Sequence, residues 1–195
     1  MIRHAALAGS LLALFLTAPA RADEFGMRLS AAAIERTHHF VLYDGTYRVI
    51  AYPKGDVAPD RGVCADEIIR AYRTLGIDLQ QRLHEDMLAN FQLYPKLWGL
   101  SHPDSNIDHR RVPNLERFFT RHGKVLAVTS KAADYKAGDI VTWRLGGTLP
   151  HIGIVTAQTI AHGTRPLIVH NVGLGPMLED VLFTYPLYGH YRYTG

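Results

Sequence analysis

The apolar residues change from a helical period to a strand period near residue 124, and this change constrains the fold more than any other feature of the sequence. Upstream, apolar side chains recur every three or four positions, as on one face of a helix, in the segments 64–75, 79–91 and 114–122. Downstream, short runs rich in β-branched and aromatic residues are separated mostly by glycine, proline or polar turns, at 125–128, 140–144, 152–156, 167–171 and 188–193. Helices followed by strands predict an α+β domain, with N-terminal helices packed on an antiparallel β-sheet.

The region before residue 60 carries weaker signals. Residues 28–37, which are rich in alanine, predict a short helix, and residues 40–50, which alternate around Asp44-Gly45, predict a β-hairpin. Asp78 and Asn114 are expected to cap the second and third of the helices downstream. No repeat, low-complexity stretch or long linker divides the chain, so residues 23–195 are expected to form a single, monomeric domain.

The first 22 residues have the composition of a secretory signal peptide. A short basic start, residues 1–3, precedes an apolar run over residues 5–17 and a small-x-small cleavage motif, Ala20-Arg21-Ala22. The apolar run is too short to span a bilayer, and no later segment is long enough, so no membrane span is expected after cleavage. These features predict an exported protein, either periplasmic or secreted.

The distribution of charge and of metal-ligating residues excludes two classes of partner. The chain has 21 basic and 18 acidic residues, and loss of Arg3 and Arg21 with the signal peptide leaves 19 against 18, a net charge of +1. Because no block of lysine or arginine is present, no nucleic-acid partner is expected. The histidine and carboxylate clusters lack both the H-E-x-x-H spacing and the paired cysteines of metal sites, so neither a metal nor a cofactor is predicted.

Cys64 is the only cysteine, which excludes an internal disulfide framework, and it stands where the helix 64–75 is expected to begin. A thiolate is the active nucleophile, and a helix N-terminus and a nearby imidazolium both lower the pKa of a thiol. Asp66 and Glu67 would oppose a thiolate, so they are expected to point outward. The alternative for Cys64 is an inert thiol buried as a small apolar residue.

His151 and His170 lie on two consecutive expected strands downstream of Cys64. His151 is the candidate for the imidazole beside the thiol, and a third polar group is needed to orient its ring. His170 and Asn171 are both candidates for this group, but adjacent strand residues point to opposite faces of a sheet, so only one of them can face His151. We favour His170. Tyr43, Tyr47 and Tyr52 are candidates for lining a groove near the thiol, although a half-buried hairpin face explains them equally well.

The motifs around these residues resemble the NlpC-type branch of the papain-like cysteine peptidases. The resemblance is carried by Cys64 at a helix start, by Ala137-Gly138-Asp139 leading into a strand, by His151-Ile152-Gly153-Ile154 and by the strand that ends at His170. It implies a papain-like NlpC-type fold and a catalytic triad of Cys64, His151 and His170. Within that superfamily, the segments 60–64, 77–80, 84–87 and 189–193 resemble an exported bacterial family of unassigned function.

The resemblance implies an exported thiol hydrolase that cleaves an amide bond in peptidoglycan, acting as a stem-peptide endopeptidase or amidase on a peptidoglycan or peptide substrate. Cysteine precedes histidine in the chain, which favours the hydrolase branch over lipid acyltransferases with the permuted order. Two alternatives remain open: a non-catalytic envelope-binding module on the same fold, and a thiol acyltransferase.

Arg110, Arg111 and Asn171 are the candidates for substrate contact. Arginine binds carboxylates with two parallel hydrogen bonds, and peptidoglycan stem peptides are rich in carboxylates. The alternative for the two arginines is a structural ion pair or a solvated charge. The cysteine motif also departs from the family pattern, because Val63 precedes the thiol and Ala65-Asp66-Glu67 follow it.

Overall fold

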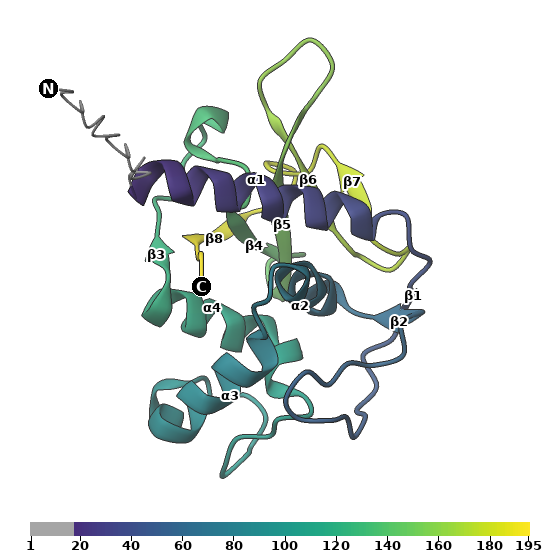
Figure 1. The fold of residues 1–195 in the computed structure, drawn as a ribbon, viewed down its shortest axis with the longest axis vertical. Helices are drawn as coiled ribbons and strands as arrows, with labels where there is room; N and C mark the ends of the chain where they lie inside the picture. The colour runs from purple at the N-terminus through teal and green to yellow at the C-terminus, as the bar shows by residue number, and fades with distance from the viewer. Residues whose placement is uncertain (1–17) are drawn as a thin grey trace, which may run out of the picture.

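The computed structural model describes residues 18–195, with side chains from residue 23 onward. Residues 1–17 of the expected signal peptide lie outside the described part of the chain. The described elements form an α+β architecture in which α1 and α2 pack on the strands of an antiparallel sheet and α3 and α4 extend the helical layer (Figure 1).

The four α-helices come early in the chain, as the sequence predicts: α1 (Ala18–Arg36), α2 (Cys64–Thr74), α3 (Leu79–Asn90) and α4 (Val112–His122). Single 3-10 turns lie at η1 (Phe91–Leu93), η2 (Asp108–Arg110) and η3 (Ala132–Asp134). Asp78 caps α3 as expected, because its side chain accepts the N–H of Gln80. The predicted cap at Asn114 is wrong. Asn114 lies inside α4 and donates to the carbonyl of Asp108.

The strands are β1 (Leu42–Tyr43), β2 (Arg61–Gly62), β3 (Lys124–Val125), β4 (Ile140–Leu145), β5 (Leu149–Thr159), β6 (Pro166–His170), β7 (Met177–Glu179) and β8 (Leu187–Arg192). Six of them form one sheet in the order β3-β8-β4-β5-β6-β7, in which every pair is antiparallel. The hairpin predicted over residues 40–50 is wrong: β1 pairs in parallel with β2, close to the start of α2. Asp44 accepts the N–H of Thr46, so the turn signal at Asp44-Gly45 is satisfied locally without a returning strand.

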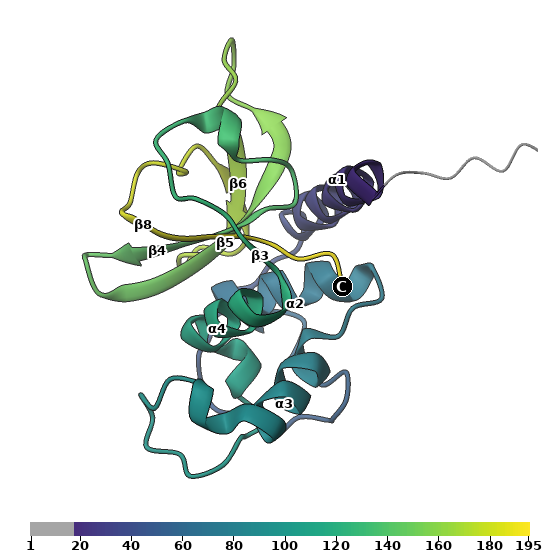
Figure 2. The ribbon, with the colours of Figure 1, turned by 90° about the vertical axis from the view of Figure 1, so that its left-hand side faces the viewer.

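Each face of the sheet contributes to its own hydrophobic core. Ile152 and Ile154 of β5 pack against the helices, in a core that also contains Cys64. Val155 of β5 and Trp143 of β4 belong to a smaller core on the opposite face. Figure 2 shows α2, α3 and α4 together on one side of the sheet. Because strand residues alternate between faces, neighbouring residues of β5 serve different cores.

The helix α1 is longer than the sequence predicts and packs on both β5 and α2. Its Gly26 meets the chain at Gly138, where a side-chain carbon on Gly26 would lie 2.3 Å from the carbonyl oxygen of Ala137. The hydroxyl of Ser30 accepts the backbone N–H of Ala157 at the end of β5. No helix within residues 18–195 is both long and apolar enough to cross a membrane.

Candidate active site

Cys64 is the first residue of α2, as the sequence predicts, and it is only 4% exposed. The hydroxyl of Tyr43 and the backbone N–H groups of Ile152 and Ala65 lie near its sulfur, and each lowers the pKa of the thiol. The pairing of β6 with β5 begins at Gly153 opposite His170, so Ile152 lies just beyond the part of β5 that pairs with β6, although it still pairs with Thr142 of β4. The thiol therefore lies at the edge of β5, beside the residue that follows His151.

Tyr43 of β1 lies beside the candidate nucleophile. Its hydroxyl is near the sulfur of Cys64, where it lowers the pKa of the thiol, and near the backbone N–H of the same residue. Tyr43 is 42% exposed, so it lies between the buried thiol and the solvent. The parallel pairing of Tyr43 with Gly62 in the short β1–β2 pair places the phenol ring at the start of α2.

The two strand histidines lie in direct contact. Nε2 of His151 lies 2.9 Å from Nδ1 of His170, and both side chains are buried. Nε2 of His170 lies 2.9 Å from a carboxylate oxygen of Glu179 on β7. Asn171, by contrast, accepts the N–H of Gly173 in the turn after β6. Of the two candidates, His170 is thus the one that faces His151.

Trp143 covers the histidine pair on the side of the smaller core. Its ring centroid lies 5.7 Å from that of His151, with the planes 29° apart, and 6.3 Å from that of His170. The indole N–H donates to the carbonyl of Leu182, so this side chain is held in place by a hydrogen bond as well as by packing. Because Trp143 is completely buried, the contact between the two histidines is shielded from water.

The electrostatics of the site differ from the sequence-based expectation. Burial raises the pKa of Cys64 to about 11, and the negative charge of Asp66 adds to this effect. Burial lowers the pKa of His151 to about 3, and the neighbouring His170 contributes in the same direction. The expected lowering of the Cys64 pKa is therefore wrong: burial raises this pKa, and both groups are neutral at pH 7.

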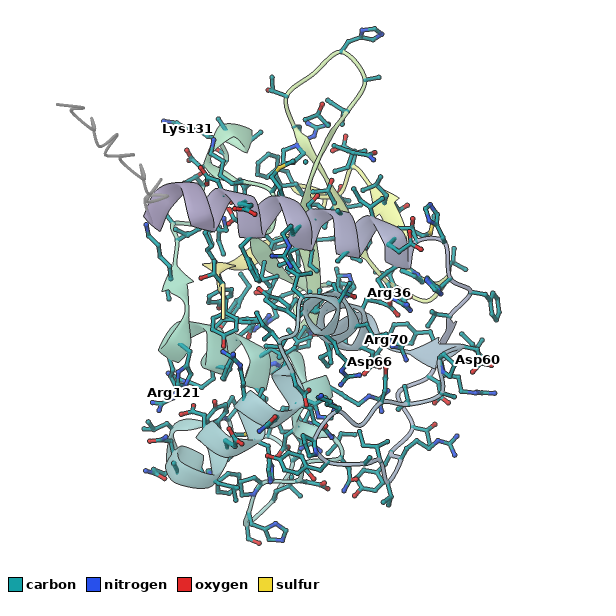
Figure 3. The ribbon with its side chains drawn as sticks, in the orientation of Figure 1. Arg36, Asp60, Asp66, Arg70, Arg121 and Lys131 are labelled. Carbon is teal, nitrogen blue, oxygen red and sulfur yellow. The ribbon has the colours of Figure 1, made fainter. Side chains whose placement is uncertain are left out.

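Asp66 and Glu67 are buried rather than turned outward, so that expectation is also wrong. Asp66 accepts the backbone N–H of Val63 at the start of α2 and two hydrogen bonds, of 2.8 and 2.9 Å, from Arg110. Glu67 accepts hydrogen bonds from Arg36 and Arg70. Figure 3 labels Asp66, Arg36 and Arg70, which lie on and beside α2. Arginines compensate both buried carboxylates, so the helix tolerates them close to the thiol.

The three residues predicted to contact substrate have other partners. Arg110 is buried in its pair with Asp66 and also donates to the carbonyls of Asp44 and Thr46, which is the structural alternative considered for it. Arg111 donates to Asp108 and stacks 4.1 Å above the ring of Trp98. Asn171 is fully buried. None of these three contacts Cys64 through a hydrogen bond in the described part of the chain.

Sequence reasoning missed Glu179 and Trp143. Glu179 pairs with Ile168 in the β6–β7 register, so it lies on the same face as His170 and diagonal to it. An acidic residue on a short strand directly after the His170 strand was the only signal for it, and that signal depends on knowing the register. Trp143 lies opposite His151 in the β4–β5 register and was visible only as part of a strand.

Within residues 18–195 as described, no cluster of three or more His, Cys, Asp or Glu side chains is arranged to hold a metal ion. The side chains that the candidate site brings close together are a thiol at a helix start, a tyrosine hydroxyl, two imidazoles in series and a carboxylate.

Comparison with known proteins gives a family. The family model described as "Domain of unknown function (DUF1287)" matches residues 30–193. A curated protein of Escherichia coli (strain K12), "Uncharacterized protein YijF", is 53% identical over 153 residues, which cover 78% of this chain and 74% of that relative. No solved structure matches the chain. The matched region includes all residues of the candidate site, from Tyr43 to Glu179.

Proposed function

This chain belongs to the DUF1287 family, and we propose that it is an exported thiol hydrolase that cleaves an amide bond in peptidoglycan. The observation that carries the proposal is the 2.9 Å contact between His151 and His170 on strands next to a thiol at a helix N-terminus. We further propose that the domain has the papain-like fold of NlpC-type peptidases. A nucleophile on a helix start and its base on an adjoining strand are the features that support this.

In the proposed reaction, Cys64 attacks the amide carbonyl and His151 acts first as a base and then as an acid. Nε2 of His151 is occupied by His170, so Nδ1 is the ring atom available to take the thiol proton. The sulfur forms a bond to the carbonyl carbon, and the proton on His151 then passes to the leaving amine. Water, deprotonated by His151, attacks the resulting thioester and releases the acid and the free thiol.

The backbone N–H of Cys64 and the hydroxyl of Tyr43 are the proposed donors to the oxyanion. They lie close together at the start of α2, so a carbonyl oxygen placed there would meet two donors. The hydroxyl now lies on the sulfur and has to turn towards the substrate. Because the thiol and His151 are both neutral at rest, the proton transfer accompanies substrate attack and does not precede it.

We propose Arg117 in place of Arg110 as the residue that binds a substrate carboxylate. A cavity of about 400 Å³ lies between α4 and the β4–β5 hairpin, and its lining includes Arg117, Arg144, Pro150 and Tyr188. Pro150 points to the same face of β5 as Ile152, which packs in the same core as Cys64, so the cavity and Cys64 share one face of the strand. Arg144 is neutralised by Glu116, whereas Arg117 has no ion-pair partner within residues 18–195.

The experiment is digestion of purified peptidoglycan followed by mass spectrometry of the soluble muropeptides. The parent protein should release new fragments, and the Cys64→Ala and His151→Ala variants should not. His39→Ala, which removes a half-exposed histidine near the end of α1, is the matched control and should act as the parent does. Release of the same fragments by Cys64→Ala would refute the proposal.

A non-catalytic envelope-binding module is the second candidate, and the burial of the thiol together with its high pKa favours it. This function predicts that the parent sediments with insoluble peptidoglycan but releases no fragments, and that Cys64→Ala sediments equally well. An acyltransferase would instead form new products when amine acceptors are added to the digestion.

A further inference from the structure

We propose that Glu179 sets the tautomers of His170 and His151 and is thereby the positioning residue that leaves Nδ1 of His151 unprotonated. The consequence for catalysis rests on the proposed hydrolase function. The tautomers themselves do not rest on it, because they can be measured in the resting protein.

The argument starts from the chemistry of the carboxylate. An ionised carboxylate only accepts hydrogen bonds, so the 2.9 Å contact with Glu179 requires a proton on Nε2 of His170. Burial lowers the pKa of His170 despite the opposing effect of Glu179, so the ring carries one proton. Nδ1 of His170 is therefore a lone pair and an acceptor.

The contact between the two histidines fixes the tautomer of His151 in the same way. Because Nδ1 of His170 accepts, Nε2 of His151 must carry the proton that it donates across 2.9 Å. Neutral His151 then has no proton on Nδ1, and this is the atom required to accept a proton from the thiol. One carboxylate thus fixes the protonation of two rings in series.

The opposite arrangement satisfies the same histidine–histidine contact but disables the base. If His170 carried its proton on Nδ1, it would donate to Nε2 of His151, whose own proton would then occupy Nδ1 and block transfer from Cys64. The contact between the rings is the same in both arrangements, so the tautomer of each ring is determined by the group that is hydrogen-bonded to Nε2 of His170.

Other neighbours of His170 do not determine its tautomer. The indole N–H of Trp143 is engaged by the carbonyl of Leu182, so Trp143 presents its ring and not its donor. Asn171 is turned towards Gly173. Within residues 18–195, Glu179 is the charged side chain hydrogen-bonded to His170.

Glu179 also differs from the rings in its exposure, and this makes it suitable for substitution. Its side chain is 35% exposed, whereas that of His170 is 1% exposed. A change at Glu179 therefore leaves the core around Trp143 intact. Glutamine has the same shape but offers either an oxygen or an N–H to His170, so Glu179→Gln removes the preference without removing the contact. Glu179→Asp keeps a carboxylate acceptor, so it keeps the proton on Nε2 of His170 provided that the shorter side chain reaches the ring.

The test is nitrogen-15 NMR of histidine-labelled protein at pH 7, with resonances assigned from the His151→Gln and His170→Gln variants. The parent should show both rings protonated on Nε2. Glu179→Gln should shift one or both towards Nδ1 protonation, and Glu179→Asp should restore the parent pattern. Glu35→Gln is the matched control, because Glu35 contacts the exposed His38 and should leave both rings unchanged.

In the digestion assay, Glu179→Gln should lower kcat about tenfold or more at unchanged KM, within the roughly 10²–10⁴-fold that a general base contributes. A parent protein with Nδ1 of His151 protonated would overturn the inference, as would a Glu179→Gln variant whose two rings keep the parent tautomers. If the parent cleaves no peptidoglycan, the proposed function fails while the NMR result on Glu179 stands on its own.

Discussion

The protonation of Cys64 provides the sharpest physical prediction. Its pKa of about 11 leaves roughly one molecule in ten thousand as thiolate at pH 7, whereas an unperturbed thiol with a pKa of about 8.5 leaves about 3%. The folded chain should therefore hold about 300 times less thiolate than the unfolded chain at the same pH.

Tyr43→Phe tests the physical origin of this value. The hydroxyl of Tyr43 lies near the sulfur and lowers the pKa of the thiol, as a donor to its charged form would, so removal of the hydroxyl should raise the pKa of Cys64 further. A hydrogen bond to a charged group contributes about 1.5–3 kcal/mol, which corresponds to a rise of about one to two pH units. Tyr47→Phe is the matched control, because the hydroxyl of Tyr47 contacts Asp104 and Asn106 and not the thiol.

The assay is carbon-13 NMR of protein labelled at the cysteine β-carbon. The chain contains one cysteine, so one resonance reports the titration directly. We expect it to stay at the thiol position through pH 9 in the parent and in Tyr47→Phe, and to require still higher pH in Tyr43→Phe. A resonance at the thiolate position at pH 7, titrating together with a histidine, would show a resting ion pair and refute the reasoning.

Three further predictions concern stability, each measured by urea unfolding. Burial lowers the pKa of His109 to about 3, so below pH 6.5 the unfolded chain binds a proton on this residue and the folded chain does not. The free energy of unfolding therefore falls as the pH drops. His109→Leu should reduce the loss of unfolding free energy between pH 7 and pH 4 by about 3 kcal/mol, and an unchanged loss would contradict this. Arg110→Met should lower the free energy of unfolding at pH 7 by about 3–5 kcal/mol, because it leaves the carboxylate of Asp66 buried without its ion-pair partner. A change near zero would mean that Asp66 does not need this ion pair. Gly153→Ala should lower the free energy of unfolding by about 1–3 kcal/mol, because the added carbon would lie 2.7 Å from Ile168 and 3.1 Å from Trp143. An unchanged free energy would show that the side chains of the smaller core can shift at little cost.

The sequence was sufficient for features that depend on periodicity. The order of helices and strands predicted the α+β class, and the start of α2 at Cys64 followed from the apolar spacing downstream of it. The alternation of strand side chains correctly separated His170 from Asn171, because a two-residue period leaves only one of them on the face of His151.

The features that the sequence could not predict depend on partners far along the chain. Asp66 resembles an exposed acid of a first helical turn, but Arg110, 44 positions later, pairs with it in the interior. The turn signal at Asp44-Gly45 did not produce a hairpin, because β1 finds its partner at Arg61 and Gly62.

Glu179 reaches His170 only through the β6–β7 register. Local propensity carries no information about such contacts, because ion pairs and strand registers are decided by the whole chain.

The thiol and the imidazole proposed as its base lie in different hydrophobic cores. Cys64 packs in the core shared with the helices, whereas His151 stacks on Trp143, which belongs to the smaller core on the other face of the sheet. If the proposed function holds, a chain in which only the helical core has assembled would contain a buried, protonated thiol without a positioned base. Local opening of the smaller core would then abolish the activity while leaving the sulfur buried.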